Sequence, residues 1–348
     1  MVVSARMRCG PGIRASTDRY SGDIRKMQQI IRSTLLACGW AAASLCALAQ
    51  QPYPGAPITL IVPFAAGSGT DAVARMLGQR LAERLQQPVL VDNKPGANAQ
   101  IAAQIVAKAR PDGYTLFMTT NTSHSANPAL YRQLKYDPIK DFTPVARVGE
   151  LPFALVVHPS VPAQSLAELI DHARANPGKL SYATPNSTSL VALESIKRIA
   201  DLDIVGIPYK SSPQAMTDLV SGQVQVYVVD LGSGRSMLAS DKLRTLGITT
   251  ARPSALLPGV PPIGLTVKGF DLTSWNGIFG PAGMPPAVVS RLHTELQAVL
   301  ADPSTQDKLA QIGFQVWPSK SPEEFARYVA DQLTHWRRLI EQAGIRPE

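Results

Sequence analysis

Cysteine is scarce in this 348-residue chain, and its three copies, Cys9, Cys38 and Cys46, all lie before residue 50. The rest of the chain therefore has no thiol for a disulfide, a nucleophile or a cysteine-based metal site. Charged residues are also few, at 17%, whereas hydrophobic residues make up 45%. This balance is typical of a chain that buries large cores, and the length suits about two domains of roughly 100–200 residues each.

Motifs for catalysis and metal binding are lacking as well. The five histidines show no metal-ligand spacing. Ser68 lacks the G-x-S-x-G pattern of a hydrolase nucleophile, because Ala66 and Thr70 stand where glycines are needed. Acid–base catalysis by paired carboxylates is not indicated either, since only Asp71 is expected at the crevice edge. We therefore expect no catalytic residue, no metal and no cofactor.

The positive charge is concentrated at the N-terminus. Seven of the 34 basic residues but only two of the 26 acidic residues precede residue 50, so the formal charge of +8 falls to +3 without that segment. The remainder shows no basic stripe that could bind phosphates, and we expect no nucleic-acid partner.

A signal sequence accounts for the first segment, residues 1–49. Arg32 precedes an uncharged run that ends in Ala47-Leu48-Ala49, the small-x-small pattern read by signal peptidase. We expect Sec export, cleavage near Ala49 and a location in the periplasm, with Met27 as an alternative translation start. A retained N-terminal anchor and a lipoprotein modified at Cys38 are the alternatives. The hydrophobic stretch before Cys38 is short for a lipoprotein signal.

Apolar runs alternate with amphipathic segments in the rest of the chain. This order predicts an α/β fold with mostly parallel sheets that are flanked by helices. The first series comprises strands at 58–62, 89–91 and 114–118, with helices at 70–85 and 97–108. A second series of the same kind runs from about residue 154 to residue 248, and its first helix, at 165–175, begins with the capping box Ser165-x-x-Glu168.

The pattern changes near Trp275, where the chain is expected to return to the first domain. Ser321-Pro322-Glu323-Glu324 begins a last helix with a capping box. We expect its apolar stripe to cover the first lobe, and we predict lobes of residues 50–149 plus 275–348 and of residues 150–274. The stripe consists of Phe325, Val329, Leu333, Trp336 and Ile340.

The segment after the first predicted strand is a candidate anion site. Gly67 and Gly69 allow close backbone approach just before a helix, whose first amides favour an anion. An ordinary helix entry capped by Thr70 or Asp71 explains the same residues.

A dinucleotide fingerprint is the enzyme alternative at this place. Gly67-x-Gly69-x-x-Ala72 is followed about 20 residues later by Asp92. Four residues separate the strand from Gly67, where the turn of a dinucleotide site is tight, and an exported protein meets little nicotinamide cofactor.

A polar loop is predicted after the third strand, over residues 119–128, and is rich in Ser, Thr and Asn. Because the carboxyl ends of parallel strands share one edge of a sheet, this loop should face the 67–70 segment. A solvated surface loop is the alternative.

Short motifs recur in order along nearly the whole chain after residue 50. In the first half they are Tyr53-Pro54, Pro63-Phe64-x-x-Gly67-x-Gly69-x-Asp71-x-x-Ala74-Arg75, Val91-Asp92-Asn93-Lys94-Pro95-Gly96-Ala97, Pro111-Asp112-Gly113-Tyr114-Thr115-Leu116 and Asn127-Pro128-Ala129-Leu130-Tyr131. In the second half they are Val205-x-Ile207-Pro208-Tyr209-Lys210, Asp218-Leu219-x-x-Gly222-Gln223-Val224 and Trp275-x-Gly277-x-x-Gly280-Pro281-Ala282-Gly283-x-Pro285.

Together these motifs resemble the Bug-type solute receptors of tripartite tricarboxylate transporters. The resemblance implies a two-lobed Venus-flytrap receptor of the periplasmic binding protein type, which captures a small organic carboxylate and delivers it to a two-subunit membrane permease. It implies no catalysis, and we expect a monomer. An exported receptor that serves a sensor, and the dinucleotide-binding enzyme, remain as alternatives.

The resemblance also implies the site residues of the first lobe. Here the sequence predicts Phe64, Ala66, Gly67, Ser68, Gly69, Thr70, Asp71, Thr119, Asn121 and Ser123.

The second lobe departs from the family pattern in two of its loops, at residues 184–190 and 211–214, so ligand specificity cannot be transferred. Lys210 is predicted to pair with a distal carboxylate, or to be a solvated lysine. Asp230 is predicted to accept an ammonium group, or to cap the next turn. The site residues predicted here are Thr184, Asn186, Ser187, Ser189, Tyr209, Lys210 and Asp230.

Overall fold

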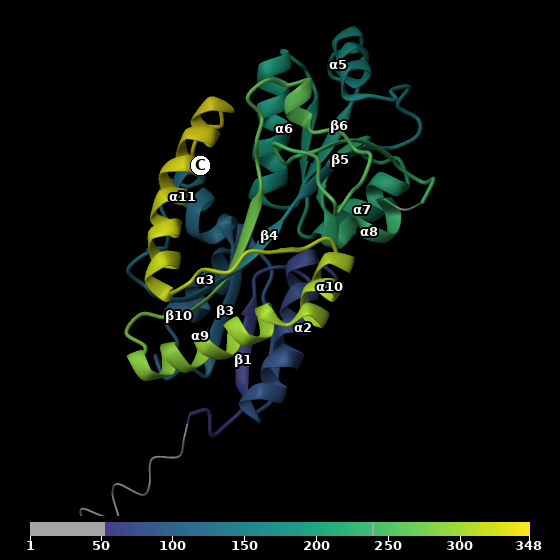
Figure 1. Ribbon diagram of the computed structural model, residues 1–348. Coiled ribbons are helices and arrows are strands. Elements are labelled where there is room, and N and C mark those ends of the chain that lie inside the picture. The colour runs from purple at the N-terminus through teal and green to yellow at the C-terminus, as the bar shows by residue number, and fades with distance from the viewer. Residues whose placement is uncertain (1–52, 239) are drawn as a thin grey trace, which may run out of the picture. The chain divides into compact units, whose positions relative to one another are not determined.

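Two β-sheets organise the chain (Figure 1). The computed structural model describes residues 53–238 and 240–348, so the predicted leader, residues 1–49, lies outside the described residues. Residues 54–348 form a single unit. Within the described residues, no helix combines the length and the apolar character needed to cross a membrane.

The first sheet has the strand order β11-β4-β10-β3-β1-β2. Strand β1 pairs in parallel with β2 and β3, whereas β10 is antiparallel to β3 and β4, and β11 is antiparallel to β4. The strands are β1 (Ile58–Val62), β2 (Val89–Asn93), β3 (Thr115–Thr120), β4 (Phe142–Leu151), β10 (Ser274–Pro281) and β11 (Gln315–Val316).

The second sheet has the order β7-β6-β8-β5-β9. Strand β6 is parallel to β7 and β8, and β5 is antiparallel to β8 and β9. The strands are β5 (Phe153–Val157), β6 (Ser181–Thr184), β7 (Val205–Pro208), β8 (Val226–Asp230) and β9 (Arg244–Ile248).

The two-lobed α/β class predicted from the sequence is confirmed, with one correction. The sheets are mixed and not mostly parallel, because β4 and β10, which connect to the second sheet, run against their neighbours. Only Pro152 separates β4 from β5. The strands of the second sheet all come from residues 153–248. The exact boundaries of the lobes stay a prediction.

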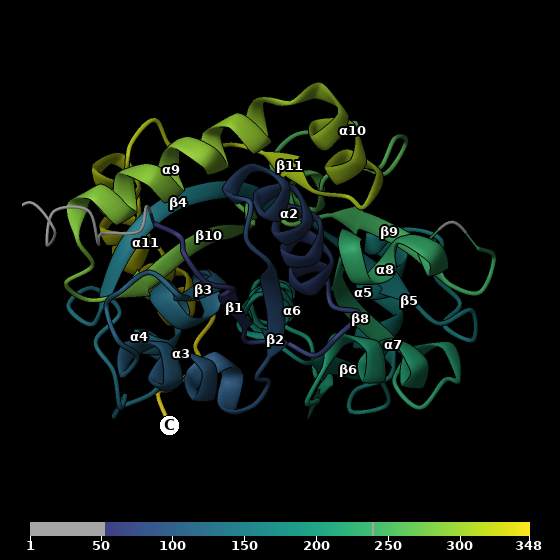
Figure 2. The same ribbon diagram turned by 90° about the horizontal axis from the view of Figure 1, so that it is seen from below.

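Helices flank both sheets. On the first sheet, α2 and α9 lie on one side and α3 and α11 on the other (Figure 2). The helices before β5 are α2 (Gly69–Leu85), the 3₁₀ turn η1 (Ala97–Ala99), α3 (Gln100–Ala107), the π-helix η2 (Thr122–Ala126) and α4 (Asn127–Leu130). Those that follow are α5 (Leu166–Ala175), α6 (Ser187–Ala200), α7 (Ser212–Val220), α8 (Leu231–Leu238), η3 (Ile263–Leu265), α9 (Pro286–Ala301), α10 (Pro303–Gln311) and α11 (Pro322–Gln342).

Helix starts follow local chemistry. The Ser165 side chain accepts a hydrogen bond from the Glu168 amide, and that of Ser321 accepts from the Glu324 amide, so both predicted capping boxes are confirmed. The cap of α2 is Ser68, which accepts from the Asp71 amide. The prediction that Thr70 or Asp71 caps this helix was wrong, because the helix begins one residue earlier than expected.

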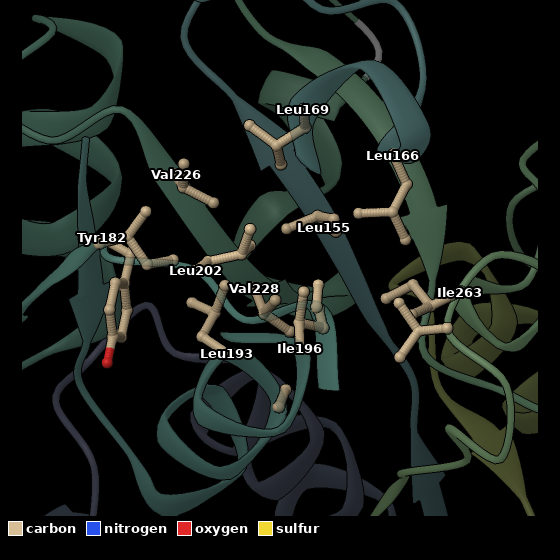
Figure 3. Packing of buried hydrophobic residues seen from close by; sticks show 14 of the residues in the cluster. Leu155, Leu166, Leu169, Tyr182, Leu193, Ile196, Leu202, Val226, Val228 and Ile263 are labelled. Atoms are coloured by element: carbon tan, nitrogen blue, oxygen red, sulfur yellow. The ribbon is translucent and has the colours of Figure 1, made fainter. Parts of the chain in front are cut away.

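The core of the second sheet lies between β5, β8 and the helices α5 and α6 (Figure 3). Leu155, Val226 and Val228 of the sheet contact Leu169, Leu193 and Ile196 of those helices in one buried cluster. Such burial contributes roughly 1.5–3 kcal/mol for each large side chain.

Helix α11 contributes to two cores. Phe325 and Val329 pack with Trp275 of β10, as expected for a helix that covers the first lobe. Trp336 and Ile340 instead belong to the buried cluster of the second sheet. That cluster also contains Ala126 of η2 and Leu130 of α4, so this half of the helix contacts elements on both sides, and coverage of the first lobe by the whole stripe stays a prediction.

Candidate functional site

Polar side chains from both sheets enclose a small cavity of about 20 Å³. A volume of this size holds roughly one water molecule. The residues that line it are Phe64, Ser68, Gly69, Thr70, Thr120, Thr122, Leu151, Phe153, Asn186, Thr188, Ser212, Asp230 and Ser274. The 67–70 segment and the end of the third strand therefore meet at one place, as the sequence predicted, and they face the second sheet there.

Asp71 organises the loop between β1 and α2. Its carboxylate accepts hydrogen bonds from the Gly67 amide at 3.0 Å, from Asn93 Nδ2 at 2.9 Å and from Arg75 Nε at 3.1 Å. Burial alone would raise the pKa of Asp71, but these donors together hold its pKa below the usual value. Gly67 has φ +82°, a conformation that favours glycine. Asp71 thus shapes the loop and does not line the cavity.

The backbone amides of this loop are bonded within the chain. The Gly67 amide donates to Asp71, the Ser68 amide to the Ala65 carbonyl at 3.1 Å, and the Gly69 amide to Ser233 Oγ at 3.1 Å. In this closed arrangement the lining groups offered by the segment are therefore the side chains of Ser68 and Thr70, together with the positive end of α2.

The predicted polar loop 119–128 is not a loop. Thr119 and Thr120 end β3, and the following residues form η2 and the start of α4. Residues 119–127 are all buried. The Oγ atoms of Thr119 and Ser123 lie 2.7 Å apart, and Asn121 donates to Thr188 and accepts from Ser274. The loop prediction was wrong because these polar groups bond to one another, to Ser274 of β10 and to Thr188 of α6 instead of to water.

His124 lies in the apolar interior beside this segment. Its ring stacks on Phe279 at 4.0 Å between centroids, and burial lowers the pKa of His124 to about 3. Its Nδ1 lies 2.8 Å from Ser123 Oγ. His124 is therefore neutral at ordinary pH and is a packing residue of η2.

The second sheet brings two more helix starts to the cavity. Asn186 caps α6 by accepting from the Ser189 amide at 2.9 Å, and Ser211 caps α7. Ser187, in the first turn of α6, lies across from Thr122 with 2.8 Å between their hydroxyl oxygens. The Ser189 hydroxyl donates to the Val228 carbonyl and does not line the cavity.

Asp230 brings a buried carboxylate to the cavity. It precedes α8 and accepts from the Ser233 amide at 2.7 Å and the Ser233 hydroxyl at 2.8 Å, which is the geometry of a helix cap. No ion pair of the described residues includes Asp230. Burial raises the pKa of Asp230 despite these bonds.

The electrostatics of the cavity come from helix ends and not from side-chain cations. Among the residues that the structure describes, no lysine, arginine or histidine lines it, and Asp230 is its one carboxylate. The amino ends of α2, α6 and α7 all contribute lining residues, and each carries a partial positive charge. This arrangement favours an anionic group, which it can hold through hydroxyls and amides.

The predicted site residues divide into two groups. Tyr209 donates to Asp218 at 2.9 Å, and Lys210 is exposed; neither lines the cavity. Those that line the cavity are Phe64, Ser68, Gly69, Thr70, Asn186 and Asp230. Those that do not are Ala66, Gly67, Asp71, Thr119, Asn121, Ser123, Thr184, Ser187, Ser189, Tyr209 and Lys210.

The prediction missed several lining residues. Thr188 and Ser212 stand in the first turn of helices whose caps were visible in the sequence, so the capping pattern could have found them. Leu151 ends β4 and Phe153 begins β5, where the chain passes from the first sheet to the second, and no sequence motif marks either residue as part of a site. The other residues missed are Thr120, Thr122 and Ser274.

A larger groove of about 800 Å³ lies elsewhere, against α10 and β11. Its charged lining residues are Glu150, Asp271 and Asp307 with a single arginine, Arg252. Three acidic residues disfavour an anion, whereas the smaller cavity has the single carboxylate of Asp230, whose pKa is raised by burial, and three helix amino ends, so it is the better candidate site. In the part of the chain that the structure describes, no group of three His, Cys, Asp or Glu side chains could hold a metal ion.

Comparison with known proteins identifies the family of the chain. Residues 73–345 match the family model described as tripartite tricarboxylate transporter family receptor. A UPF0065 protein of Bordetella bronchiseptica is 36% identical over 323 residues, which cover 92% of this chain and 96% of the relative.

Solved structures agree with the sequence comparison. R. palustris Rpa4515 with adipate is 35% identical, with a TM-score of 0.83, and the match covers 85% of this chain and all of that one. The periplasmic binding protein BugD is 31% identical, with a TM-score of 0.80, over 85% of this chain and all of that one. The resemblance inferred from the motifs is confirmed.

Proposed function

The chain belongs to the tripartite tricarboxylate transporter receptor family, and we propose that it is a non-catalytic receptor that closes two lobes around a small organic carboxylate. The observation that carries the proposal is the cavity between the sheets, where three helix amino ends meet without a lysine or arginine. An acid group can be held there by hydroxyls and dipoles, which avoids part of the desolvation cost of a buried ion pair.

The size of the cavity requires that the lobes move apart. About 20 Å³ admits no organic acid, so a ligand enters an open form and closure follows from contacts with both lobes. Thr70 from α2 and Thr188 from α6 stand on opposite sides of the cavity and provide such contacts.

The chemical class of the ligand is proposed from the site and from one relative. Rpa4515 was solved with adipate, a dicarboxylate, and is 35% identical to this chain. The hydroxyl and amide donors of the cavity can bind one carboxylate of the ligand. The side chains of Asn186 and Ser212 can contact the remainder of a short acid.

The remaining parts of the proposal follow from the family. The receptor works in the periplasm after export, as a monomer, and delivers its ligand to a two-subunit membrane permease. A binding role without catalysis is proposed from the same family and from its structural neighbours, which are periplasmic binding proteins.

Thermal shift with a panel of carboxylates tests the proposal. Adipate and shorter dicarboxylates should raise the melting temperature, since a ligand that binds only the folded state stabilises it. Thr70→Val, which removes a lining hydroxyl without changing the side-chain volume, should weaken adipate binding by about tenfold. Thr266→Val, at an exposed position, is the matched control and should bind as the wild type does. A shift produced by NADH and by no organic acid would favour the dinucleotide alternative instead.

A further inference from the structure

We propose that Ser233 and Asp230 form a latch that holds the amino end of α2 against α8 and stabilises the closed receptor before any ligand contributes. The inference rests on the proposed function, in which closure captures the ligand. It assigns Ser233 a positioning role that the sequence motifs did not indicate, and it gives Asp230 a structural task in place of a ligand contact.

A directed chain of hydrogen bonds crosses between the lobes at this point. The Gly69 amide, in the first turn of α2, donates to Ser233 Oγ at 3.1 Å. The Ser233 hydroxyl in turn donates to Asp230 Oδ2 at 2.8 Å. The Ser233 amide donates to Asp230 Oδ1 at 2.7 Å, which fixes the position of the carboxylate. The Asp230 carboxylate thus fixes the position of Ser233, whose hydroxyl oxygen accepts the hydrogen bond from the Gly69 amide of the opposite lobe.

Two glycines make this contact possible. A Cβ on Gly232 would lie 2.6 Å from the Gly69 Cα, closer than real Cβ contacts come. A Cβ on Gly69 would clash with the Asp230 carboxylate. Neither glycine has a positive φ, so the need for glycine here is the close approach of two backbones and not an unusual conformation.

The latch is formed entirely by groups of the chain, so it favours closure without a ligand. A ligand that binds the closed form then gains affinity in proportion to the fraction of receptor already closed. Loss of one net hydrogen bond should reduce the closed-to-open ratio by about five- to tenfold, and the apparent affinity should fall by the smaller factor by which the closed fraction drops.

Spin labels on either side of the contact test this. Cysteines at Gln79, exposed on α2, and Gln214, exposed on α7, report the separation of the lobes by double electron–electron resonance in a background where Cys9, Cys38 and Cys46 are serine. Without ligand, the wild type should show a dominant short distance. Ser233→Ala should populate a longer distance, and Gly232→Val should make that distance dominant. Ser236→Ala, exposed on the same helix, is the matched control and should leave the distribution unchanged.

The two hypotheses fail separately in this design. Adipate titrations should show a weaker affinity for Ser233→Ala, by the factor by which the labels show the closed fraction to fall, with circular dichroism confirming that the variants fold. A wild-type distance that is already long, or one that neither substitution lengthens, would overturn the latch while leaving carboxylate binding intact. If no carboxylate binds the wild type, the proposed function fails while the labels still report whether the latch exists.

Discussion

The two sheets meet on two sides that are built differently. On one side, η2, α6 and α11 contact each other, and Ala126, Leu193, Trp336 and Ile340 share one buried apolar cluster. On the other side, α2 approaches α8 through Gly69 and Gly232, with hydrogen bonds in place of apolar side chains. The first contact, which we call the apolar side, buries large side chains, and the second, which we call the polar side, buries almost none.

Because of this difference, the two contacts between the sheets should need different free energies to separate. Apolar burial contributes roughly 1.5–3 kcal/mol for each large side chain, and parting such a surface loses all of it. A hydrogen bond contributes about 1 kcal/mol net, because water replaces the partner when the contact opens. The side of α11 should therefore stay together while the side of α2 opens.

Trp336→Ala should have the largest effect, because it removes the main side chain of the apolar side. Trp336 is fully buried in the cluster that includes β5 and α6. We expect the free energy of unfolding to fall by about 3–5 kcal/mol in urea denaturation. Leu265→Ala, at a side chain that is 73% exposed, is the control and should cost less than about 0.5 kcal/mol. A loss at Trp336 no larger than the control would mean that the apolar side does not hold the sheets together.

Asp71→Ala tests the hydrogen bonds that hold the loop between β1 and α2, next to the contact of α2 with α8. The substitution leaves the Gly67 amide and Asn93 without their acceptor, so we expect a loss of about 2–3 kcal/mol in the free energy of unfolding, together with weaker ligand binding. Asp92→Ala is the neighbouring control: its pair with Lys94 is exposed, and its loss should cost less than about 0.5 kcal/mol. Equal losses at the two positions would contradict the role given to Asp71.

Acid should weaken the core of the first sheet through His124, whose ring packs against Phe279 and Phe142. Its pKa is about 3 in the folded protein, so between pH 6.5 and 3 the unfolded chain binds a proton here and the folded protein does not. The free energy of unfolding should fall by about 2 kcal/mol from this group between pH 6.5 and 5. His124→Phe should remove that part of the pH dependence, whereas His158→Phe, at a partly exposed site, should retain it. Parallel pH profiles for wild type and His124→Phe would rule this source out.

The smallest effect is expected at the hydroxyl pair of Thr122 and Ser187. Their oxygen atoms lie 2.8 Å apart across the cavity wall. A double-mutant cycle with Thr122→Val and Ser187→Ala should give a coupling free energy of about 1 kcal/mol in urea unfolding. Additive single effects would show that this hydrogen bond does not help to hold the two sheets together.

Features that depend on residues close together in the sequence were predictable, whereas features that depend on distant residues were not. The capping boxes at Ser165 and Ser321 were predictable because both partners lie within four residues. The burial of residues 119–127 was not, because it depends on partners such as Thr188 and Ser274, which lie far along the chain. A run of Ser, Thr and Asn has the same composition on a surface as in a satisfied polar interior.

The residues of the candidate site were likewise predictable only where a local motif marks them. Ser68, Gly69 and Thr70 were found because a glycine-rich helix start is visible in sequence, and they line the cavity. Ser233 was not found, since its role arises only when α8 is placed against α2. Residues such as Lys210, chosen for their charge, lie away from the cavity because a chemical type does not reveal which way a strand end faces.

The passage of α11 from one core to the other has a consequence for how the molecule forms. The helix is the last long element of the chain, and it completes the packing of both Trp275 and β5. Both halves therefore depend on α11 for their final packing, and removal of this helix would expose apolar surface in both clusters at once.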